Sequence, residues 1–418
     1  MKYADEKIIE NLINEINQFN ATPEFGTTRV LFTKQELASR KYIKNKMCAL
    51  GLSVTEDCIG NIFATLKGTN PELSPVWTGS HIDTVPNAGK FDGMAGIVAG
   101  LEALRIIKES GEQHKRNITL VVYTSEEPTR FGLSCLGSRA LSGDLDTEVC
   151  KQIFDKSGRS LYDKLIELGY DAQNIPSLKK SKGDIYASVE LHIEQSVSLE
   201  KNKKTIGIVD KICAPSDFTV EVIGRQSHAG GTSMKNRRDA FAAASEMSVA
   251  LENLAKKCTS EYNTATIGLV TVVPGAVNVI PGKCTFTVDL RDCNKETKDK
   301  LITEFTSEFY KIADKRHVQV IITEECNDTP LTCSQDIKNI IQEICIKKNI
   351  SFLNLVSGAY HDTLFVGKFA PSAMIFVPSK NGISHSPEEW TNFSDIAKGT
   401  DVLADTLLKL SNNETELN

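Results

Sequence analysis

The sequence predicts an α/β domain with a largely parallel sheet, interrupted by a smaller α+β domain. Three observations support this fold class. Before about Cys213, short apolar runs alternate with helical stretches, which is typical of βαβ units. Between Cys213 and Leu331, alternating strands flank two helices, and after Leu331 helix and strand alternate again. We therefore expect a discontinuous domain of residues 1–212 and 329–418, with residues 213–328 inserted as a second domain.

The elements of the larger domain follow from hydrophobic periodicity. Apolar residues at helical spacing from Ile8 to Phe19 predict an amphipathic first helix. The run from Ile118 to Tyr123 is apolar throughout, which indicates a buried strand. Together the patterns predict helices over residues 8–19, 93–110 and 394–410, and strands over residues 61–66, 75–78 and 118–123.

The inserted domain has a different pattern. Its apolar residues mostly alternate with polar ones, which is typical of strands with one solvated face. The predicted strands cover residues 217–223, 264–273, 284–290 and 318–322, and the predicted helices cover residues 238–256 and 296–313. The resulting order, βαββαβ, indicates a ferredoxin-like sandwich.

Composition narrows the class of protein. The chain has 418 residues, of which 40% are hydrophobic and 24% charged, so disorder and coiled coil are poor interpretations. Lys+Arg 48 against Asp+Glu 54 gives a net charge of −6, which offers no footprint for nucleic acid or an anionic membrane. No apolar run is long enough for a signal peptide or a membrane span, so we expect a cytoplasmic protein. The 11 cysteines include no CxxC pair, which favours reduced thiols.

The histidines are distributed unevenly. Five of the seven lie in short polar clusters at predicted strand ends or in loops: His81, His192, His228, His361 and His385. His114 and His317 lie in charged stretches and are expected at the surface. Histidines grouped with carboxylates are typical of metal sites, although a single histidine is more often structural.

Two clusters follow predicted strands. His81 has Asp83 two residues on, a carboxylate able to orient a metal-binding imidazole. Asp92 precedes the predicted helix at 93–110, so it is either a metal ligand or a helix N-cap. Glu126 and Glu127 follow the strand at 118–123, and adjacent carboxylates are costly to bury unless a cation or proton is shared. The alternative for this pair is a solvated loop.

A third cluster places Glu190, His192 and Glu194 on one face of a strand, which is either part of a site or an exposed edge. Combined, the clusters supply histidine and carboxylate ligands for two adjacent divalent ions, with Zn²⁺, Mn²⁺ and Co²⁺ all compatible. The candidate ligands are His81, Asp92, Glu127, His192 and His385. Glu126 remains as a carboxylate that can take a proton from an activated water, which is the chemistry of metal-assisted amide hydrolysis.

Seven separated motifs resemble those of the M20 family of dinuclear metallohydrolases, in its hydantoinase/carbamoylase branch. They are GSHIDTVPNAGKFDGMAGIVAGLEAL, YTSEEPTRFGLSCLGSRAL, VELHIEQ, SHAGGTSMKNRRDA, GAVNVIPG with DLRD, GAYHD and GISHSPEEW. The resemblance runs in order from about residue 8 to residue 410. It implies a zinc-exopeptidase-like catalytic domain and an inserted lid and dimerisation domain.

Carried over position by position, the resemblance implies a role for each candidate. Asp92 would bridge two metal ions, Glu126 would be the general base, and Asp83 would orient His81. His228 resembles the family's histidine that reaches across a homodimer to polarise the scissile carbonyl. The residues that resemble substrate-binding positions are Gln195, Asn278, Arg291 and His361.

The branch implies hydrolysis of a ureido or carbamoyl group on a small carboxylate, with release of ammonia and CO₂, as in purine or pyrimidine catabolism. The SEEPTRFG and AYHD segments look most like ureidoglycolate amidohydrolases, so ureidoglycolate or allantoate is favoured. N-carbamoyl-L-amino acids and N-carbamoyl-β-alanine are the alternative substrates. Ser196 and Gly231–Ser233 depart from the common pattern beside substrate-binding positions, so they bear on substrate identity more than on reaction type. An M20 dipeptidase is less favoured, and a non-catalytic scaffold would be expected to lack a ligand or the base.

Overall fold

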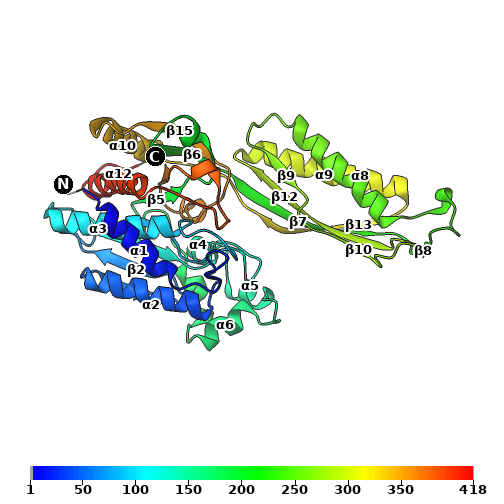
Figure 1. Ribbon diagram of the computed structural model, residues 1–418, viewed down its shortest axis with the longest axis horizontal. Helices are drawn as coiled ribbons and strands as arrows, with labels where there is room; N and C mark the ends of the chain where they lie inside the picture. The colour runs from blue at the N-terminus through cyan, green and yellow to red at the C-terminus, as the bar shows by residue number, and fades with distance from the viewer. Residues whose placement is uncertain (1–2, 418) are drawn as a thin grey trace. The chain divides into compact units, whose positions relative to one another are not determined.

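The computed structural model describes residues 3–417, which form two compact units (Figure 1). The first unit contains the described chain up to Asp210, Thr332–Leu355, and the described chain from His361 onward. The second contains Lys211–Leu331 and Val356–Tyr360. The segment 356–360 therefore folds with the second unit, although the sequence analysis grouped it with the larger domain.

The first unit is built on a nine-stranded mixed sheet. Its strands are β1 (Ser53–Glu56), β2 (Ile62–Leu66), β3 (Val76–His81), β4 (Ile118–Tyr123), β5 (Ala187–Ile193), β6 (Ile206–Ile212), β14 (Leu331–Thr332), β15 (Phe352–Ser357) and β16 (Ser372–Val377). The order is β1-β2-β4-β3-β5-β16-β6-β14, with β15 paired to β6. The central strands β4, β3, β5 and β16 are parallel, and every residue in them is buried.

Helices pack against this sheet. They are α1 (Glu6–Asn17), α2 (Lys34–Ala49), α3 (Met94–Ser110), α4 (Leu136–Ser142), α5 (Thr147–Gln152), α6 (Leu161–Glu167), α7 (Ser198–Lys201), α10 (Gln335–Lys347), α11 (Thr363–Val366) and α12 (Phe393–Ser411), with the 3₁₀ turns η1 (Ala172–Leu178) and η3 (Lys380–Gly382). The helix α3 lies against β3 and β5, and a Cβ at Gly96 would lie 2.3 Å from the Leu191 carbonyl oxygen. Glycine at this position therefore lets the helix approach the strand closely.

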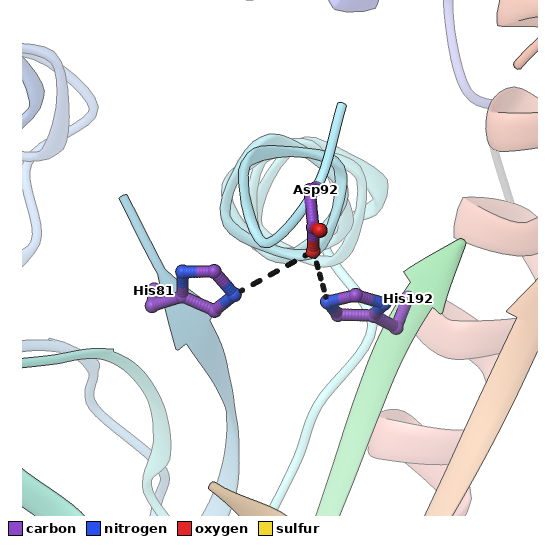
Figure 2. Close-up of side chains that lie close together, drawn as sticks. All are labelled: His81, Asp92 and His192. Carbon is purple, nitrogen blue, oxygen red and sulfur yellow. Dashed lines mark ion pairs between the residues drawn. The ribbon is translucent and has the colours of Figure 1, made fainter. Parts of the chain in front are cut away.

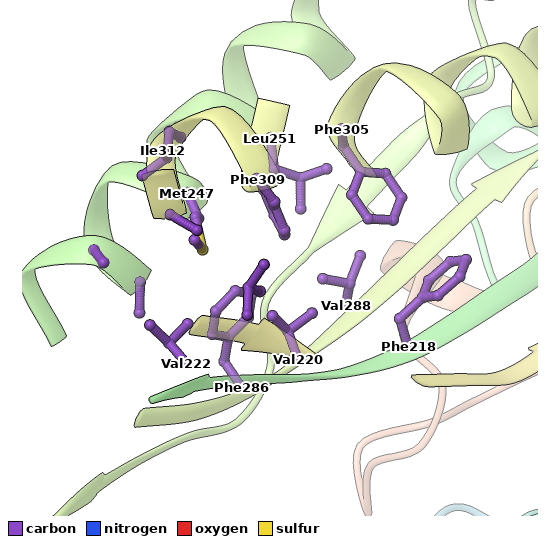
Figure 3. Close-up of a cluster of buried hydrophobic side chains, with 14 of the residues drawn as sticks. Phe218, Val220, Val222, Met247, Leu251, Phe286, Val288, Phe305, Phe309 and Ile312 are labelled. Carbon is purple, nitrogen blue, oxygen red and sulfur yellow. The ribbon is translucent and has the colours of Figure 1, made fainter. Parts of the chain in front are cut away.

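The second unit is a five-stranded antiparallel sheet with two helices. Its elements are β7 (Ala214–Ile223), α8 (Ala240–Lys257), β9 (Thr264–Thr266), β10 (Val270–Val273), β12 (Lys283–Asp292), α9 (Lys295–Arg316) and β13 (Gln319–Asn327), and a separate pair is formed by β8 (Ser227–His228) and β11 (Val279–Ile280), with the 3₁₀ turn η2 (Met234–Asn236) between them. In the order β10-β12-β7-β13, the strands that flank α8 (β7 and β10) alternate with the strands that flank α9 (β12 and β13), as expected for a βαββαβ unit. Figure 3 shows its core, where Phe305 and Phe309 of α9 and Met247 of α8 face strand residues such as Val220 and Phe286.

The predicted fold class is confirmed, with two corrections of detail. The single strand predicted over residues 264–273 is two strands, because the chain around Gly268 leaves the ladder and each half pairs with a different part of β12. His114 is buried, not at the surface, since its carbonyl accepts the N–H of Thr69 and neighbouring Arg116 bonds to Ser411. Among residues 3–417, no helix combines the length and apolar character needed to cross a membrane.

Candidate metal centre

Four parallel strands of the first unit end at one edge, and the candidate residues follow those ends. His81 is the last residue of β3, His192 lies one residue before the end of β5, and Glu126 and Glu127 follow β4. His385 lies in the segment after β16. Because carboxyl ends of parallel strands share an edge of the sheet, residues more than 300 positions apart in the chain come together there.

His81, Asp92 and His192 form the first ligand group (Figure 2). Asp92 Oδ1 lies 3.2 Å from Nε2 of His192 and 3.8 Å from Nε2 of His81. All three side chains are buried. Asp92 is not the N-cap of α3, because Gly93 occupies that position and the helix has no side-chain cap. The capping alternative is therefore excluded, and the carboxylate faces the two imidazoles.

The other oxygen of Asp92 faces a second group. Oδ2 lies 3.1 Å from Nε2 of His385, and the same nitrogen lies 3.2 Å from Oε1 of Glu127. Asp92, Glu127 and His385 can each offer a ligand atom within 4.8 Å of the others. His385 is half exposed while the two carboxylates are buried, so this group opens to solvent. The carboxylate of Asp92 is shared by both groups, one oxygen to each.

Asp83 organises the loop that carries the two glutamates. Its Oδ1 accepts the N–H of Glu126 at 3.3 Å and its Oδ2 accepts the N–H of Glu127 at 3.1 Å. His81 Nδ1 lies 3.0 Å from the Asp83 carbonyl oxygen and 3.6 Å from Oδ1. In the neutral form of the ring, which is the form that binds a metal, this arrangement places the hydrogen on Nδ1 and leaves the lone pair of Nε2 toward Asp92.

The same tautomer follows for His192. Its Nδ1 lies 2.9 Å from the Ile193 carbonyl oxygen, and its Nε2 accepts the N–H of Gly93 at 3.2 Å. His81 Nε2 is buried and has no hydrogen-bond partner among the described residues. A lone pair left without a partner in a buried site next to carboxylates is the environment that a cation would satisfy.

Buried carboxylates crowd the site, and a cation would stabilise their charged forms. Burial raises the pKa of Glu126 well above its usual range, the attraction of His81 opposes this shift, and the charge of Glu127 adds to it. Burial likewise raises the pKa of Glu127. Burial would lower the pKa of His81, but the carboxylates of Glu126, Asp83 and Asp92 outweigh it and raise that pKa well above normal. Imidazole and carboxylate donors without a thiolate fit Zn²⁺, Mn²⁺ or Co²⁺.

The predicted strand face at 190–194 is buried, so it is not an exposed edge. Glu190 accepts hydrogen bonds from Ser80 at 2.8 Å and from the Thr363 hydroxyl at 2.6 Å, so its oxygens are already used. Glu194 accepts the N–H groups of Ser198 and Leu199 at the start of α7. These two glutamates hold the scaffold in place around His192.

The two substrate candidates of the first unit lie beside the ligand groups. Gln195 Nε2 donates to Asp92 Oδ2 at 2.9 Å, and its Oε1 is buried without a hydrogen-bond partner among residues 3–417. The His361 ring is buried 4.5 Å from the His192 ring, centroid to centroid. Burial lowers the pKa of His361 well below normal, and His192 adds to that shift, so His361 is neutral.

The remaining candidates lie in the second unit. His228 and Asn278 are close together, because His228 pairs with Val279 and the N–H of Ala229 donates to the Asn278 carbonyl oxygen at 3.0 Å. His228 Nδ1 accepts the N–H groups of Gly230 at 3.1 Å and Gly231 at 2.9 Å. Because Nδ1 is the acceptor, the hydrogen of the ring lies on Nε2, which can therefore donate.

Arg291 lies toward the other end of β12. It pairs with Pro215, whereas Lys283, three residues after Ile280, pairs with Ile223. Its Nη2 lies 2.9 Å from Asp289 Oδ2, and its guanidinium carbon lies 5.5 Å from the Tyr360 ring centroid. Eight residues of strand separate Arg291 from Lys283, or roughly 26 Å at 3.3 Å per residue.

The sequence reasoning missed two residues, Ser384 and Glu389. Glu389 Oε1 accepts the N–H groups of Phe91 at 2.8 Å and Asp92 at 3.1 Å, and its side chain is buried. Ser384 Oγ lies 2.9 Å from Asp92 Oδ2 and 2.8 Å from Glu389 Oε2. Both stand in the GISHSPEEW segment, but nothing in the pattern distinguishes Glu389 from its exposed neighbour Glu388.

Comparison with known proteins places these residues in a family. The model of peptidase family M20/M25/M40 matches residues 77–409. Ureidoglycolate hydrolase of Arabidopsis thaliana is 38% identical over 98% of this chain and 87% of its own length. Allantoate amidohydrolase of Bacillus subtilis is 33% identical over 98% of this chain and 99% of its own. N-carbamoyl-L-amino-acid amidohydrolase of a Pseudomonas species is 33% identical, covering 95% of this chain and 96% of its own.

Solved structures of similar proteins have the same fold as this chain. The crystal structure of AtUAH in complex with glyoxylate superposes with a TM-score of 0.89 at 37% identity and covers 98% of both chains. A hydantoinase/carbamoylase family amidase from Burkholderia vietnamiensis gives a TM-score of 0.88 at 30% identity, covering 99% of both chains. The chain therefore belongs to the M20 family of metal-dependent hydrolases and is an amidohydrolase of its hydantoinase/carbamoylase branch.

Proposed function

We propose that this amidohydrolase cleaves the C–N bond of a ureido group on a small carboxylate, with ureidoglycolate or allantoate as substrate, and releases ammonia and CO₂. The observation that carries the proposal is the carboxylate of Asp92, whose two oxygens face two separate His-and-carboxylate groups. The 38% identity to a ureidoglycolate hydrolase supports the choice of substrate. The 33% identity to an allantoate amidohydrolase supports the second substrate.

Two divalent ions, Zn²⁺ or Mn²⁺ with Co²⁺ also suitable, would supply a water of lowered pKa and a Lewis acid for the scissile carbonyl. His81, Asp92 and His192 would hold one ion, and Asp92, Glu127 and His385 would hold the other. These five residues use the Nε2 and carboxylate atoms that face one another in the structure.

Glu126 is the proposed general base. It belongs to neither ligand group, yet its Oε2 lies 3.8 Å from His81 Nε2, so it lies beside the centre without being needed as a ligand. Burial raises its pKa well above normal, which suits a carboxylate that takes a proton from the attacking water and returns it to the leaving nitrogen. Asp83 holds this glutamate in place through its backbone N–H.

Four residues are proposed to recognise the substrate. Arg291 can make a bidentate contact with the substrate carboxylate, and Gln195, Asn278 and His361 contribute polar contacts. His228 donates from Nε2 to the oxyanion that develops at the scissile carbonyl. His228 and Arg291 lie toward opposite ends of the second unit, so one small substrate cannot touch both within one chain.

We therefore infer a homodimer in which His228 and Asn278 act in the site of the partner chain. The edge strand β10 supports this, because it carries exposed apolar side chains that an isolated subunit would leave in water. These residues are Leu269, Val270, Val273 and the nearby Val277. The cytoplasmic location expected from the sequence stays a prediction.

N-carbamoyl-L-amino acids are the second candidate substrates, since an N-carbamoyl-L-amino-acid amidohydrolase is 33% identical to the chain. The test is ammonia release by protein reconstituted with Mn²⁺, assayed on ureidoglycolate, allantoate, N-carbamoyl-L-amino acids, N-carbamoyl-β-alanine and dipeptides. We expect release from a ureido compound that chelation abolishes and metal restores. Hydrolysis of dipeptides alone would refute the proposal.

A further inference from the structure

Glu389 contacts the backbone of Asp92, the residue whose carboxylate faces both ligand groups. Its Oε1 accepts the N–H groups of Phe91 and Asp92, at 2.8 and 3.1 Å. The Glu389 side chain is buried, so these hydrogen bonds are shielded from competing water. The peptide unit that precedes the Asp92 side chain is thereby fixed from a segment almost 300 residues further along the chain.

A second contact reaches the carboxylate of Asp92 itself. Ser384 Oγ lies 2.8 Å from Glu389 Oε2 and 2.9 Å from Asp92 Oδ2, the oxygen that faces His385. The hydroxyl therefore lies between the two carboxylates, and its single hydrogen can be donated to only one of them at a time. Glu389 thus contacts the main chain of Asp92 directly and also contacts the hydroxyl that reaches the Asp92 side chain.

The space around Glu389 leaves it little freedom. A Cβ built on Gly89 would lie 2.3 Å from both Cβ and Oε1 of Glu389, so the chain passes against this side chain. The Phe91 ring also packs edge-on against Trp390, with 5.4 Å between centroids. The segments around residues 91 and 389 are therefore packed into one fixed arrangement.

We propose that Glu389 is a positioning residue that, together with Ser384, sets the orientation of the Asp92 carboxylate and so allows it to be shared between two metal ions. The inference rests on the proposed two-ion centre. Its effect is expected mainly at the ion held by Glu127 and His385, because Ser384 contacts the oxygen of Asp92 that faces this group. Hydrogen bonds to a ligating carboxylate fix its geometry, and their loss typically weakens metal binding about 10- to 100-fold.

The test measures stepwise Mn²⁺ binding to metal-free protein by calorimetry, and the electron paramagnetic resonance spectrum of the loaded protein. We expect Ser384→Ala and Glu389→Ala to bind the second Mn²⁺ about 10- to 100-fold more weakly. The spectrum should change from that of a coupled Mn²⁺ pair to that of separate ions. Glu389→Gln keeps an acceptor for both N–H groups and a polar partner for Ser384, so it should restore tight binding of both ions.

Matched controls lie in the same segment. Glu388 is exposed next to Glu389, and Ser386 Oγ accepts only the N–H of Glu388 among the contacts of this loop, at 3.3 Å. Glu388→Ala and Ser386→Ala should bind two ions as the unaltered protein does. Ser384→Ala removes one hydroxyl and leaves both backbone hydrogen bonds of Glu389 intact, so it provides the test if Glu389→Ala does not fold.

The inference is overturned if Ser384→Ala and Glu389→Ala bind both ions with unchanged affinity and an unchanged coupled spectrum. It is also overturned if the control variants weaken the second ion equally. Binding is read without substrate, so this outcome is distinct from a failure of the proposed function. Protein that binds two ions in the expected manner but hydrolyses no ureido compound would refute the proposed substrate and leave the positioning role standing.

Discussion

A side chain at position 93 would occupy the space of the His81 imidazole. Gly93 has φ +64°, and a Cβ built on it would lie 2.4 Å from Nε2 of His81 and 2.5 Å from the two adjacent ring carbons. The chain therefore begins α3 by passing over the nitrogen that faces Asp92. Only glycine combines this backbone conformation with room for the ring.

Gly93→Ala should accordingly displace His81 and lower the metal content. Gly111 is the matched control, because it ends the same helix with φ +70° and a Cβ there would meet no atom within 4 Å. Both variants should lose stability, of the order of 1–2 kcal/mol for a non-glycine residue with positive φ. Elemental analysis should find about two ions per chain in Gly111→Ala and fewer in Gly93→Ala. Equal metal content in the two variants would contradict the steric argument.

Glu126 and Glu127 are neighbours with different predicted roles. Glu126→Gln should lower kcat about 10²- to 10⁴-fold while two ions remain bound, because it removes the base and no ligand. Glu127→Gln should weaken the ion shared with Asp92 and His385. Metal analysis and steady-state kinetics on both variants distinguish the roles. Loss of an ion from Glu126→Gln would show that Glu126 is a ligand, since it lies 3.8 Å from His81.

Asp83→Asn should affect metal binding and turnover together. The carboxylate accepts two backbone N–H groups, from Glu126 and Glu127, whereas an amide can accept only one and turns its NH₂ group toward the other. The loop with both glutamates should shift, weakening metal binding and turnover each about 10- to 100-fold. Calorimetry and kinetics measure the two effects. A variant with reduced turnover but unchanged metal affinity would place Asp83 in the chemistry instead.

Stability of the metal-free protein should depend on the titration of Asp362. Burial raises the pKa of this carboxyl to about 8, with the charge of Glu190 adding to the shift. The folded protein then keeps a proton that the unfolded chain releases near pH 4, so this group's contribution is fully present below about pH 4 and is lost as the pH rises through about 8.

Asp362→Asn removes that titration and keeps an acceptor for the Ser138 hydroxyl, which lies 2.5 Å from Oδ1. In urea unfolding of chelator-treated protein, the free energy of unfolding of the unaltered chain should fall relative to the variant between about pH 4 and 8. The slope should approach 1.4 kcal/mol per pH unit. A constant difference across this range would show that Asp362 is ionised in the folded protein.

Much of the fold could be predicted because the central parallel strands are fully buried and the long strands β7 and β12 largely alternate between buried and half-buried residues. The strand predicted at Ile118–Tyr123 has the same bounds as β4, because the continuous apolar run begins and ends at clear changes to polar residues. The sequence could not show that the run at 264–273 divides, because both halves have strand character and only their pairing with β12 separates them. The alternation at Glu190–Glu194 is compatible with either a site or an exposed edge, and only the sheet order shows that it belongs to a central strand.

The candidate site shows the same limit. Ligand types and strand ends indicated where His81, His192 and Glu127 would lie, because parallel strands end at one edge. Glu389 could not be found, since an acidic residue beside another acidic residue gives no sign of which one is buried. The role of Gly93 is also invisible in the sequence, because its constraint comes from a ring twelve residues earlier in the chain.

The central claim is that Asp92 is shared by two metal ions, and anomalous diffraction from crystals loaded with Mn²⁺ or Zn²⁺ tests it most directly. We predict two anomalous peaks, one beside His81, His192 and Asp92 Oδ1, and one beside Glu127, His385 and Asp92 Oδ2. A single peak, or a peak held by Glu190, His192 and His361, would contradict the account.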